Sequence, residues 1–347
     1  MKVSVVIRSK DEADRLRLTL ASLASQTEPA EVVIVNDGSS DHTADVVAQA
    51  ARELDIVDVR HATAAGRSAA ANAGAARASG DVLVFLDGDT LAEPEFVAKH
   101  AALHRAEQGV VVRGETYHLR CTRPFRDPQT GTPQPGEEER IARMSDRERE
   151  RSLVTLAQVI GAFAEIDRRA QPGIYPGFGP RKLYELEMEA LRKNGDCNVL
   201  WVAASGANQS VPREAFLRSG GFHPDISINE HRELALRLCR SGLRMIPTTA
   251  RSYHMTHRSG WRDPLDDLDW EAVFYGEHPE PVVALLPLFW QSISDHSPLP
   301  EAARIPSLPE LERRSARYVG LPSRAAVREA YLADFSAGVE ARPRVTT

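Results

Sequence analysis

Short apolar segments alternate with segments of helical pattern through the first hundred residues of the chain. The apolar segments have the length and the valine, isoleucine and leucine content of buried strands, and they cover 3–7, 31–35, 56–59 and 81–86. The expected helices between them cover 11–26, about 42–54 and 66–78. Because parallel strands need such crossover segments, the alternation predicts an α/β fold with a doubly wound parallel sheet and helices on both faces.

Polar residues follow three of these strands, at the edge of a parallel sheet where ligands bind. The strongest signal is Asp87-Gly88-Asp89, directly after the segment 81–86. Two carboxylates separated by one glycine can face the same opening, and a desolvated carboxylate is costly without a partner. A divalent cation such as Mg²⁺ or Mn²⁺, shared with phosphate oxygens, would remove that cost. The alternative is an ordinary Asp-Gly turn without a ligand.

A second polar motif, Asn36-Asp37-Gly38-Ser39-Ser40-Asp41, follows the strand 31–35. Asp37 could accept a hydrogen bond from the imide N–H of a uracil or from a ribose hydroxyl, as acids at this position do in other nucleotide-binding folds. The alternative is a turn in which Asp41 or Ser40 caps the next helix. The two interpretations are compatible, because one acid can cap the helix while the other binds a ligand.

The ordered series of motifs resembles that of the family-2 glycosyltransferases of the GT-A fold. Besides the two acidic motifs, the segments that carry the resemblance are Val3–Ile7, Gly66–Ser68, Asn72–Gly74, Ala78–Asp81, Gly206–Asn208, Pro212–Phe216 and Gly220–Phe222. They bracket roughly residues 1–260, with a poorly matching insertion at about 121–197. The resemblance implies a Rossmann-like doubly wound sheet with a nucleotide-sugar-binding half at 1–100, an acceptor-binding half at 101–260 and a partly helical C-terminal extension at 261–347.

For the donor site, the resemblance implies that Asp37 holds the nucleobase and that Arg67 lies near the base or the diphosphate. Asp87 and Asp89 would serve a metal ion, with Asp89 as the direct ligand. A nucleoside-diphosphate leaving group develops negative charge, which a bound cation neutralises. Without the family pattern, Arg67 would be interpreted as a surface residue of a helix.

The segment Ser252–Arg258 resembles the C-terminal histidine segment of the same family. A histidine there completes the metal site, and we assign this role to His254 rather than His257 because the tyrosine-histidine pattern of the family matches it. Arg258 would reach the diphosphate. Imidazole together with carboxylates suits Mn²⁺ somewhat better than Mg²⁺. The alternative is that both histidines are structural side chains of a strand.

The catalytic base is the point at which the sequence departs from the family pattern. In the family a Glu-Asp pair precedes a helix of the form ELALRL, and the aspartate deprotonates the acceptor. Here the helix is present at Glu233–Leu238, but the pair is Glu230-His231. Histidine titrates near working pH, so His231 is a reasonable base, while Glu230 retains the carboxylate chemistry. Two alternatives stay open: an acceptor that needs little help, such as an amine, or two residues that merely occupy a first helical turn.

The residues and the resemblance together predict a metal-dependent hexosyltransferase that moves a sugar from a UDP-sugar to a small-molecule or glycan acceptor. The resemblance alone implies that the transfer is inverting. A dTDP- or GDP-sugar is the alternative donor. A catalytically degenerate sugar-nucleotide-binding protein is the alternative function, because the family's aspartate is replaced. A sugar nucleotidyltransferase and a nicotinamide dehydrogenase are disfavoured, since neither a glycine-rich phosphate loop nor a GxGxxG motif follows the first strand.

Composition limits the partners and the compartment. The 347 residues are 42% hydrophobic and 27% charged, which is typical of a folded globular protein. The 43 Lys and Arg against 49 Asp and Glu give a net charge of −6, which provides no electrostatic footprint for nucleic acid. No apolar segment has the length of a membrane span, and the N-terminal residues do not form a secretory signal, so we expect a cytoplasmic enzyme.

The rest of the chain gives weaker indications. Alanine- and arginine-rich usage is typical of a GC-rich bacterial genome, in which natural products and cell-envelope glycans are the two kinds of acceptor to consider. Within the insertion, 137–151 is expected to be one solvated helix and 171–180 a loop. The amphipathic stretch 308–337 could mediate a homodimer or pack on its own chain.

Overall fold

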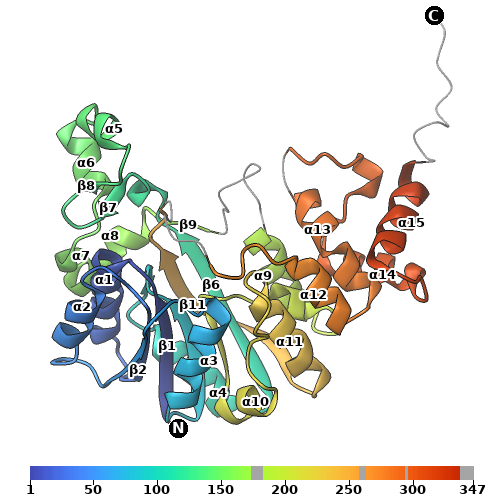
Figure 1. Cartoon of the computed structure of the whole chain (residues 1–347), viewed down its shortest axis with the longest axis horizontal. Coiled ribbons are helices and arrows are strands. Elements are labelled where there is room, and N and C mark those ends of the chain that lie inside the picture. Colours follow the sequence, from blue (N-terminus) through green and yellow to red (C-terminus); the bar gives the residue numbers. More distant parts are fainter. Residues whose placement is uncertain (173–182, 258–262, 294–295, 337–347) are drawn as a thin grey trace, which may run out of the picture. The chain divides into compact units, whose positions relative to one another are not determined.

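The computed structural model describes residues 1–172, 183–257, 263–293 and 296–336 (Figure 1). The chain divides into two compact units, the first made of residues 1–172 and 204–268 and the second of residues 173–203 and 269–347. The first hundred residues and most of 101–260 therefore lie in one unit. Part of the segment predicted as an insertion, 183–197, belongs to the same unit as most of the C-terminal extension.

A sheet of nine strands, all within the described residues, forms the centre of the first unit. Its strands are β1 (Val3–Ser9), β2 (Glu31–Asp37), β3 (Ile56–His61), β4 (Val82–Asp87), β5 (Thr90–Ala92), β6 (Val110–His118), β9 (Gln171–Pro172), β10 (Gln209–Pro212) and β11 (Arg244–His254). The order across the sheet is β3-β2-β1-β4-β10-β6-β11-β5, and β9 pairs with β6 outside this path.

The first half of the sheet is parallel, as the sequence predicts. β1 pairs in parallel with β2 and with β4, and β2 pairs in parallel with β3. The second half is mixed, because β10 runs antiparallel to both β4 and β6, and β5 runs antiparallel to β11. The expected parallel pairing therefore fails at β10 and β5, whereas β11 pairs in parallel with β6. β10 and β5 have only four and three residues, which is too short for hydrophobic periodicity to reveal them.

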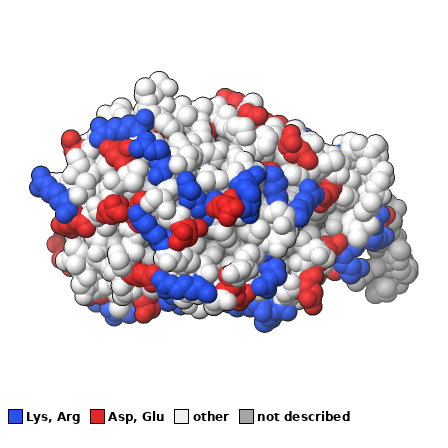
Figure 2. Space-filling model, turned by 90° about the horizontal axis from the view of Figure 1, so that it is seen from below, with Lys and Arg blue, Asp and Glu red and all other residues white. Residues whose placement is uncertain are grey.

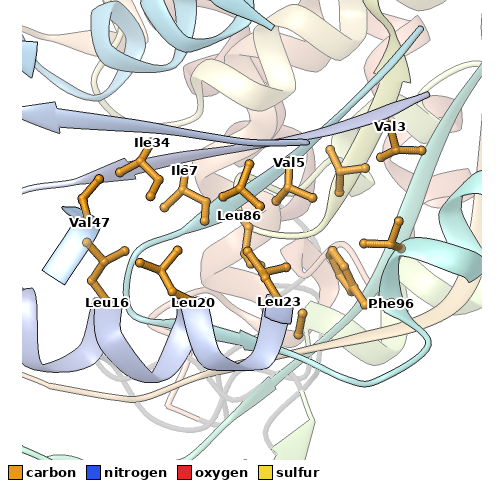
Figure 3. Close-up of a cluster of buried hydrophobic side chains, with 14 of the residues drawn as sticks. Val3, Val5, Ile7, Leu16, Leu20, Leu23, Ile34, Val47, Leu86 and Phe96 are labelled. Atoms are coloured by element: carbon orange, nitrogen blue, oxygen red, sulfur yellow. The ribbon is translucent and has the colours of Figure 1, made fainter. Parts of the chain in front are cut away.

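Helices cover both faces of the parallel half. α1 (Ala13–Ala24) places a row of leucines against one face, where they pack with valine and isoleucine side chains of β1 and β2 (Figure 3). α3 (Arg67–Arg77) packs on the opposite face, and it comes closest at Gly74, where a Cβ would lie 2.6 Å from Val6 and 2.9 Å from Val35. The other helices of the first unit outside the insertion are α2 (Thr43–Ala50), α4 (Phe96–Ala106), α10 (Arg213–Arg218) and α11 (Glu230–Arg240).

The first part of the predicted insertion is a group of short elements. They are the 3₁₀ turn η1 (Arg120–Thr122), strands β7 (Phe125–Asp127) and β8 (Thr132–Pro133), and helices α5 (Glu138–Ala142), α6 (Asp146–Ser152), α7 (Leu156–Gly161) and α8 (Phe163–Asp167). The single solvated helix expected over 137–151 is wrong, since α5 and α6 are separate. α6 begins after Ser145, which forms a capping box with Glu148 and so sets a new helix start. Of the loop expected at 171–180, residues 173–180 lie outside the described residues.

The second unit is helical. Its elements are α9 (Leu183–Lys193), η2 (Leu200–Ala203), α12 (Trp270–Glu277), α13 (Pro281–Ile293), η3 (Glu301–Ala303), α14 (Leu308–Ser315), η4 (Ala316–Tyr318) and α15 (Arg324–Ser336). The apolar residues Leu308, Leu311, Val327 and Tyr331 of the amphipathic stretch are buried within the chain itself. Among the described residues, no helix combines the length and the apolar composition that a membrane crossing requires.

Charged side chains are mixed on the surface that Figure 2 draws. Lys and Arg alternate with Asp and Glu there, and neither sign gathers into a large patch on this face. This distribution agrees with the small net charge of −6.

Candidate active site

The candidate site lies at the carboxyl ends of β1, β2 and β4, the edge of the sheet where the sequence predicts it. A cavity of about 280 Å³ opens there. Its lining residues are Arg8, Ser9, Lys10, Glu12, Asp37, Arg67, Ala70, Asp87, Asp89, His254 and His257. A larger, open cavity of about 900 Å³ is lined by residues of η1 and of the helices α5 to α8, but none of the predicted site residues lines it. The predicted donor- and metal-site residues that the structure describes therefore line the smaller cavity.

β11 brings two histidines to the end of β4. β11 pairs with β5, and the register places His254 opposite Thr90, which follows Asp89 directly. The strand ends at His254, and the chain then turns so that His257 also reaches Asp89. Nε2 of His254 lies 3.1 Å from Oδ2 of Asp89, and Nε2 of His257 lies 2.8 Å from the same oxygen. The three candidate ligand atoms lie within 4.8 Å of one another.

The donor set of this cluster fits a divalent transition-metal ion. It offers one carboxylate oxygen and two imidazole nitrogens. Nδ1 of His254 lies 3.3 Å from Nδ1 of His118, which leaves Nε2 as the ligand atom. Burial alone would raise the pKa of Asp89, but the two imidazoles hold that pKa well below its usual range. Asp89 is therefore a carboxylate, which is the form that a metal ligand needs.

Asp87 has a different partner. Arg8 and Asp87 are register partners in the parallel pair of β1 and β4, and Nε of Arg8 donates to Oδ1 of Asp87 over 2.9 Å. Nη1 of the same guanidinium donates to Oε1 of Glu230 over 2.8 Å. The two aspartates of the Asp-Gly-Asp motif thus separate, with Asp89 in the histidine cluster and Asp87 on Arg8.

Glu230 and His231 open α11, next to this arginine. Glu230 is only 3% exposed. Burial would raise its pKa, but Arg8 holds the pKa of Glu230 far below its usual range. An arginine can only donate, so Nε2 of His231 accepts the 2.8 Å hydrogen bond from Nη1 of Arg232, and Nδ1 lies 3.6 Å from Oε2 of Glu230. Burial and the Arg232 charge lower the pKa of His231. Both groups are thus engaged inside the protein.

Asp37 lines the cavity and also organises the loop before α3. Its carboxylate accepts hydrogen bonds from the backbone N–H groups of Ala65 and Gly66 over 2.8 and 3.0 Å. Nδ1 of His61 lies 2.6 Å from Oδ1 of the same carboxylate. Each carboxylate oxygen can accept two hydrogen bonds, and among the described residues Oδ2 has one donor, the N–H of Gly66, so it can accept a further one.

Arg67 opens α3 on the cavity wall. Its backbone N–H donates to Oδ2 of Asp263 over 2.8 Å, and its Nη1 lies 3.6 Å from Oδ1 of Asp266. The Asp263 carboxylate thus occupies the positive end of the α3 dipole. Arg258, which the resemblance places near the diphosphate, lies outside the described residues.

Glu12 is a site residue that the sequence analysis misses. It lines the cavity, and its Oε1 lies so close to Gly88 that a Cβ there would approach it to 2.3 Å. Burial and the nearby Asp89 and Asp87 carboxylates raise the pKa of Glu12 well above its usual range. Glycine at position 88 therefore makes room for a third acid beside the aspartates.

Signals for the other missed residues are present in the sequence. Arg8 follows a buried strand in the same way as Asp37 and Asp87, so the strand-end criterion applies to it as well. His257 lies three residues after His254, so the same segment indicates both histidines as candidate metal ligands. The prediction assigns this role to His254 alone and so misses His257. For Glu12 no local pattern indicates a site role, because its place follows from the packing of α1 under the β4 end.

Comparisons with known proteins give a consistent result. The family model described as "Glycosyl transferase family 2" matches residues 4–164. Validoxylamine A glucosyltransferase from Streptomyces hygroscopicus subsp. jinggangensis is 30% identical over 306 residues, which cover 83% of this chain and 63% of the relative. Among the first curated relatives, the matches span between 30% and 63% of the relative's length.

Solved structures share the fold. The crystal structure of S. aureus TarS 1–349 in complex with UDP-GlcNAc superposes with a TM-score of 0.51 at 16% identity, covering 85% of this chain and 68% of that one. GalNAc-T7 with UDP, GalNAc and Mn²⁺ gives a TM-score of 0.50 at 16% identity, covering 96% of this chain and 55% of that one. At such identity the likeness concerns the fold alone.

Proposed function

The chain is a member of glycosyltransferase family 2 through its domain at residues 4–164, and on this premise we propose that it transfers a hexosyl group from a UDP-sugar to a small-molecule or glycan acceptor. The transfer inverts the configuration at the anomeric carbon, as the family resemblance implies. The acceptor attacks that carbon from the face opposite the diphosphate.

The observation that carries the proposal is the cluster of Asp89, His254 and His257 at the end of β4. Its three ligand atoms lie within 4.8 Å of one another, and the cavity that they line also contains the side chains of Lys10 and Arg67. A cation bound there would supply Lewis-acid stabilisation of the leaving diphosphate. Two imidazoles and one carboxylate favour Mn²⁺ over Mg²⁺, which prefers oxygen ligands.

The remaining cavity residues bind the donor in this proposal. Asp37 accepts a hydrogen bond from the nucleobase through its partly used Oδ2, and Arg67 stabilises the diphosphate. The family resemblance gives Arg258 the same role. Asp87 is not assigned to the cation in this proposal, because Arg8 donates to its Oδ1 over 2.9 Å and it lies outside the cluster of three ligand atoms. It contributes by orienting that guanidinium at the cavity wall.

Deprotonation of the acceptor falls to Glu230 or His231. Glu230 is a weak base because Arg8 holds its pKa far below the usual range despite burial. His231 has the more suitable ordinary pKa, but its Nε2 accepts a hydrogen bond from Arg232. Nε2 of His231 is free to accept a proton only when Arg232 moves, and Glu230 becomes a better base only when Arg8 moves. The two variants Glu230→Gln and His231→Ala distinguish these possibilities.

The engagement of both candidate bases by arginines favours a second candidate function, the binding of a sugar nucleotide without turnover. The aspartate of the family is replaced by His231, and both Glu230 and His231 are held by arginines. A protein of this kind would bind UDP-sugars with Mn²⁺ and release no UDP with any acceptor.

Release of UDP from UDP-glucose and UDP-GlcNAc tests the proposal, with Mn²⁺, Mg²⁺ or EDTA and a panel of polyols, amino sugars and oligosaccharides. UDP release should require Mn²⁺ and should be lost in Asp89→Asn. It should persist in the control Asp58→Asn, which changes an aspartate on β3 that pairs with Arg60. Tight UDP binding without turnover would favour the second candidate. Absence of UDP binding with any metal ion would overturn both.

The choice of donor is tested in the same assay. The name of the Streptomyces relative, a glucosyltransferase, supports a glucosyl group, and the TarS complex with UDP-GlcNAc supports a UDP-sugar. Faster release of GDP or dTDP from the corresponding sugars than of UDP would move the assignment to the alternative donors.

A further inference from the structure

The turn that carries the two histidines is anchored through its second residue, Met255. Its backbone N–H donates to the carbonyl oxygen of Asp89 over 2.9 Å. Its side chain is fully buried in a cluster that includes Leu18 of α1 and Val159 of α7. The carbonyl oxygen of the preceding residue, His254, accepts from the N–H of Leu119 over 2.8 Å. The direction of both imidazoles therefore depends on how this short segment is held.

Arg15 of α1 holds the same turn through its guanidinium. Its Nε donates to the carbonyl oxygen of Met255 over 3.2 Å. Its Nη2 donates to the carbonyl of Phe125 over 2.6 Å, and its Nη1 to that of Arg126 over 2.7 Å. The side chain is buried, with the residue only 3% exposed. One buried cation thus joins three backbone carbonyls, one in the histidine turn and two in β7.

Thr122 adds a second side-chain contact from the start of the insertion. Its Oγ1 lies 2.9 Å from the carbonyl oxygen of Thr256 and 2.9 Å from that of Leu119. The residue is completely buried. Three consecutive carbonyl oxygens of the turn therefore have hydrogen-bond partners. Leu119 contacts that of His254, Arg15 that of Met255, and Thr122 that of Thr256.

We propose that Arg15 is a positioning residue for the cation site: it fixes the His254–His257 turn so that both imidazoles converge on Asp89, and it supports this turn on the base of the insertion at β7. The inference rests on the proposed function, since it assumes that the cluster binds a cation. Arginine suits the role because its planar fork presents several N–H donors at once, which lysine cannot reproduce. A carbonyl that loses its donor in this buried place is costly, so the turn would shift toward other partners.

The test compares Arg15→Met with Arg15→Lys and with a matched control, Arg17→Met. Arg17 lies on the same helix and approaches the same strand, with Nη2 3.4 Å from Oδ2 of Asp127. Binding of Mn²⁺ to the full chain is measured by electron paramagnetic resonance of the free ion, without any sugar nucleotide. Changes in groups that orient metal ligands weaken metal binding about 10- to 100-fold. Arg15→Met should show such a loss, Arg15→Lys a smaller one, and Arg17→Met none.

Amide hydrogen exchange of the metal-free protein gives a second readout, which does not depend on the cation. The amide of Met255 should exchange at least about tenfold faster in Arg15→Met than in the wild type, and at the wild-type rate in Arg17→Met. If the Arg15 variants do not fold, Thr122→Val should still weaken Mn²⁺ binding and speed the same exchange, because it removes the hydroxyl without removing a charge.

The outcomes separate the two proposals. Wild-type Mn²⁺ affinity together with unchanged exchange in Arg15→Met would overturn the positioning role. A wild-type protein that binds no Mn²⁺, yet exchanges faster at Met255 when Arg15 is replaced, would keep the positioning of the turn and remove the cation from the proposed function.

Discussion

Replacing Arg8 by methionine tests the charge arrangement that joins β1, β4 and α11 at the candidate site. The guanidinium lies between Asp87 and Glu230, with the Arg8 side chain 16% exposed and that of Glu230 4% exposed. Methionine keeps most of the apolar stem and removes the charge with all of its donors. The substitution therefore leaves one deeply buried carboxylate without its cation.

The cost of this change follows from the geometry. Two unit charges 2.8 Å apart attract each other by about 6 kcal/mol at an effective dielectric constant of about 20. Desolvation in the fold offsets part of this energy, and removal of one partner from a buried pair costs about 3–5 kcal/mol. We expect Arg8→Met to lower the free energy of unfolding of the first unit by about 3–4 kcal/mol at pH 7. In a Glu230→Gln background the loss should be smaller by about 2 kcal/mol, because the neutral side chain needs no cation.

The sign of the pH dependence follows from the pKa of Glu230. Burial opposes the shift, but Arg8 holds this pKa far below the ordinary value for glutamate. A lowered carboxyl pKa stabilises the fold above the ordinary pKa of the group, and this contribution is lost as the pH falls toward the lowered value. The difference in stability between the wild type and Arg8→Met should therefore shrink as the solution becomes acidic.

Hydrogen exchange of the β1 and β4 amides, measured at increasing urea concentration, reports on the first unit separately from the second. The control is Arg60→Met, which breaks a pair on β3 whose side chains are 57% and 27% exposed and which should cost less than about 1 kcal/mol. If Arg8→Met costs no more than this control, or costs the same with and without the Glu230 carboxylate, then Arg8 does not stabilise the fold through that buried carboxylate.

Acid should destabilise the fold through His100 and His104, because burial lowers their pKa values to about 3 and about 4. Both accept protons in the unfolded chain below about pH 6.5 but stay neutral in the fold. Each should therefore remove about 1.4 kcal/mol of stability per pH unit between about pH 6 and pH 4. Urea unfolding measured across this range tests the prediction, and a constant free energy of unfolding would contradict it. Glu230→Gln and His231→Ala should differ more than about tenfold in kcat for UDP release, and equal, mild losses would mean that neither is the base. Asp89→Asn should abolish Mn²⁺ binding in titration calorimetry, whereas undiminished binding would place the ion elsewhere.

Local patterns were sufficient for the part of the fold that builds the cavity. The apolar segments 3–7, 31–35 and 81–86 and the leucine face of α1 are periodic over a few residues, so β1, β2 and β4 and the helix beneath them follow from the sequence. The cavity then lies at their carboxyl ends, where parallel sheets bind ligands. Even the break between α5 and α6 has a local signal, the Ser145–Glu148 capping box.

Long-range pairing decided what the sequence could not predict. Arg8 meets Asp87 because β1 and β4 are neighbours in register, although the two residues are 79 positions apart. His257 reaches Asp89 only because β11 ends opposite β5 and the chain then turns. No periodicity within either segment contains this information. The same limit explains why β10, a strand of four residues, was not expected to run antiparallel.

The central claim is tested most directly by anomalous X-ray diffraction at the manganese absorption edge, from crystals grown with UDP and Mn²⁺. The account predicts one manganese peak bonded to Oδ2 of Asp89, to Nε2 of His254, to Nε2 of His257 and to diphosphate oxygens. A peak bonded to Asp87 in place of the two histidines, or diphosphate density with no manganese peak beside it, would contradict the account.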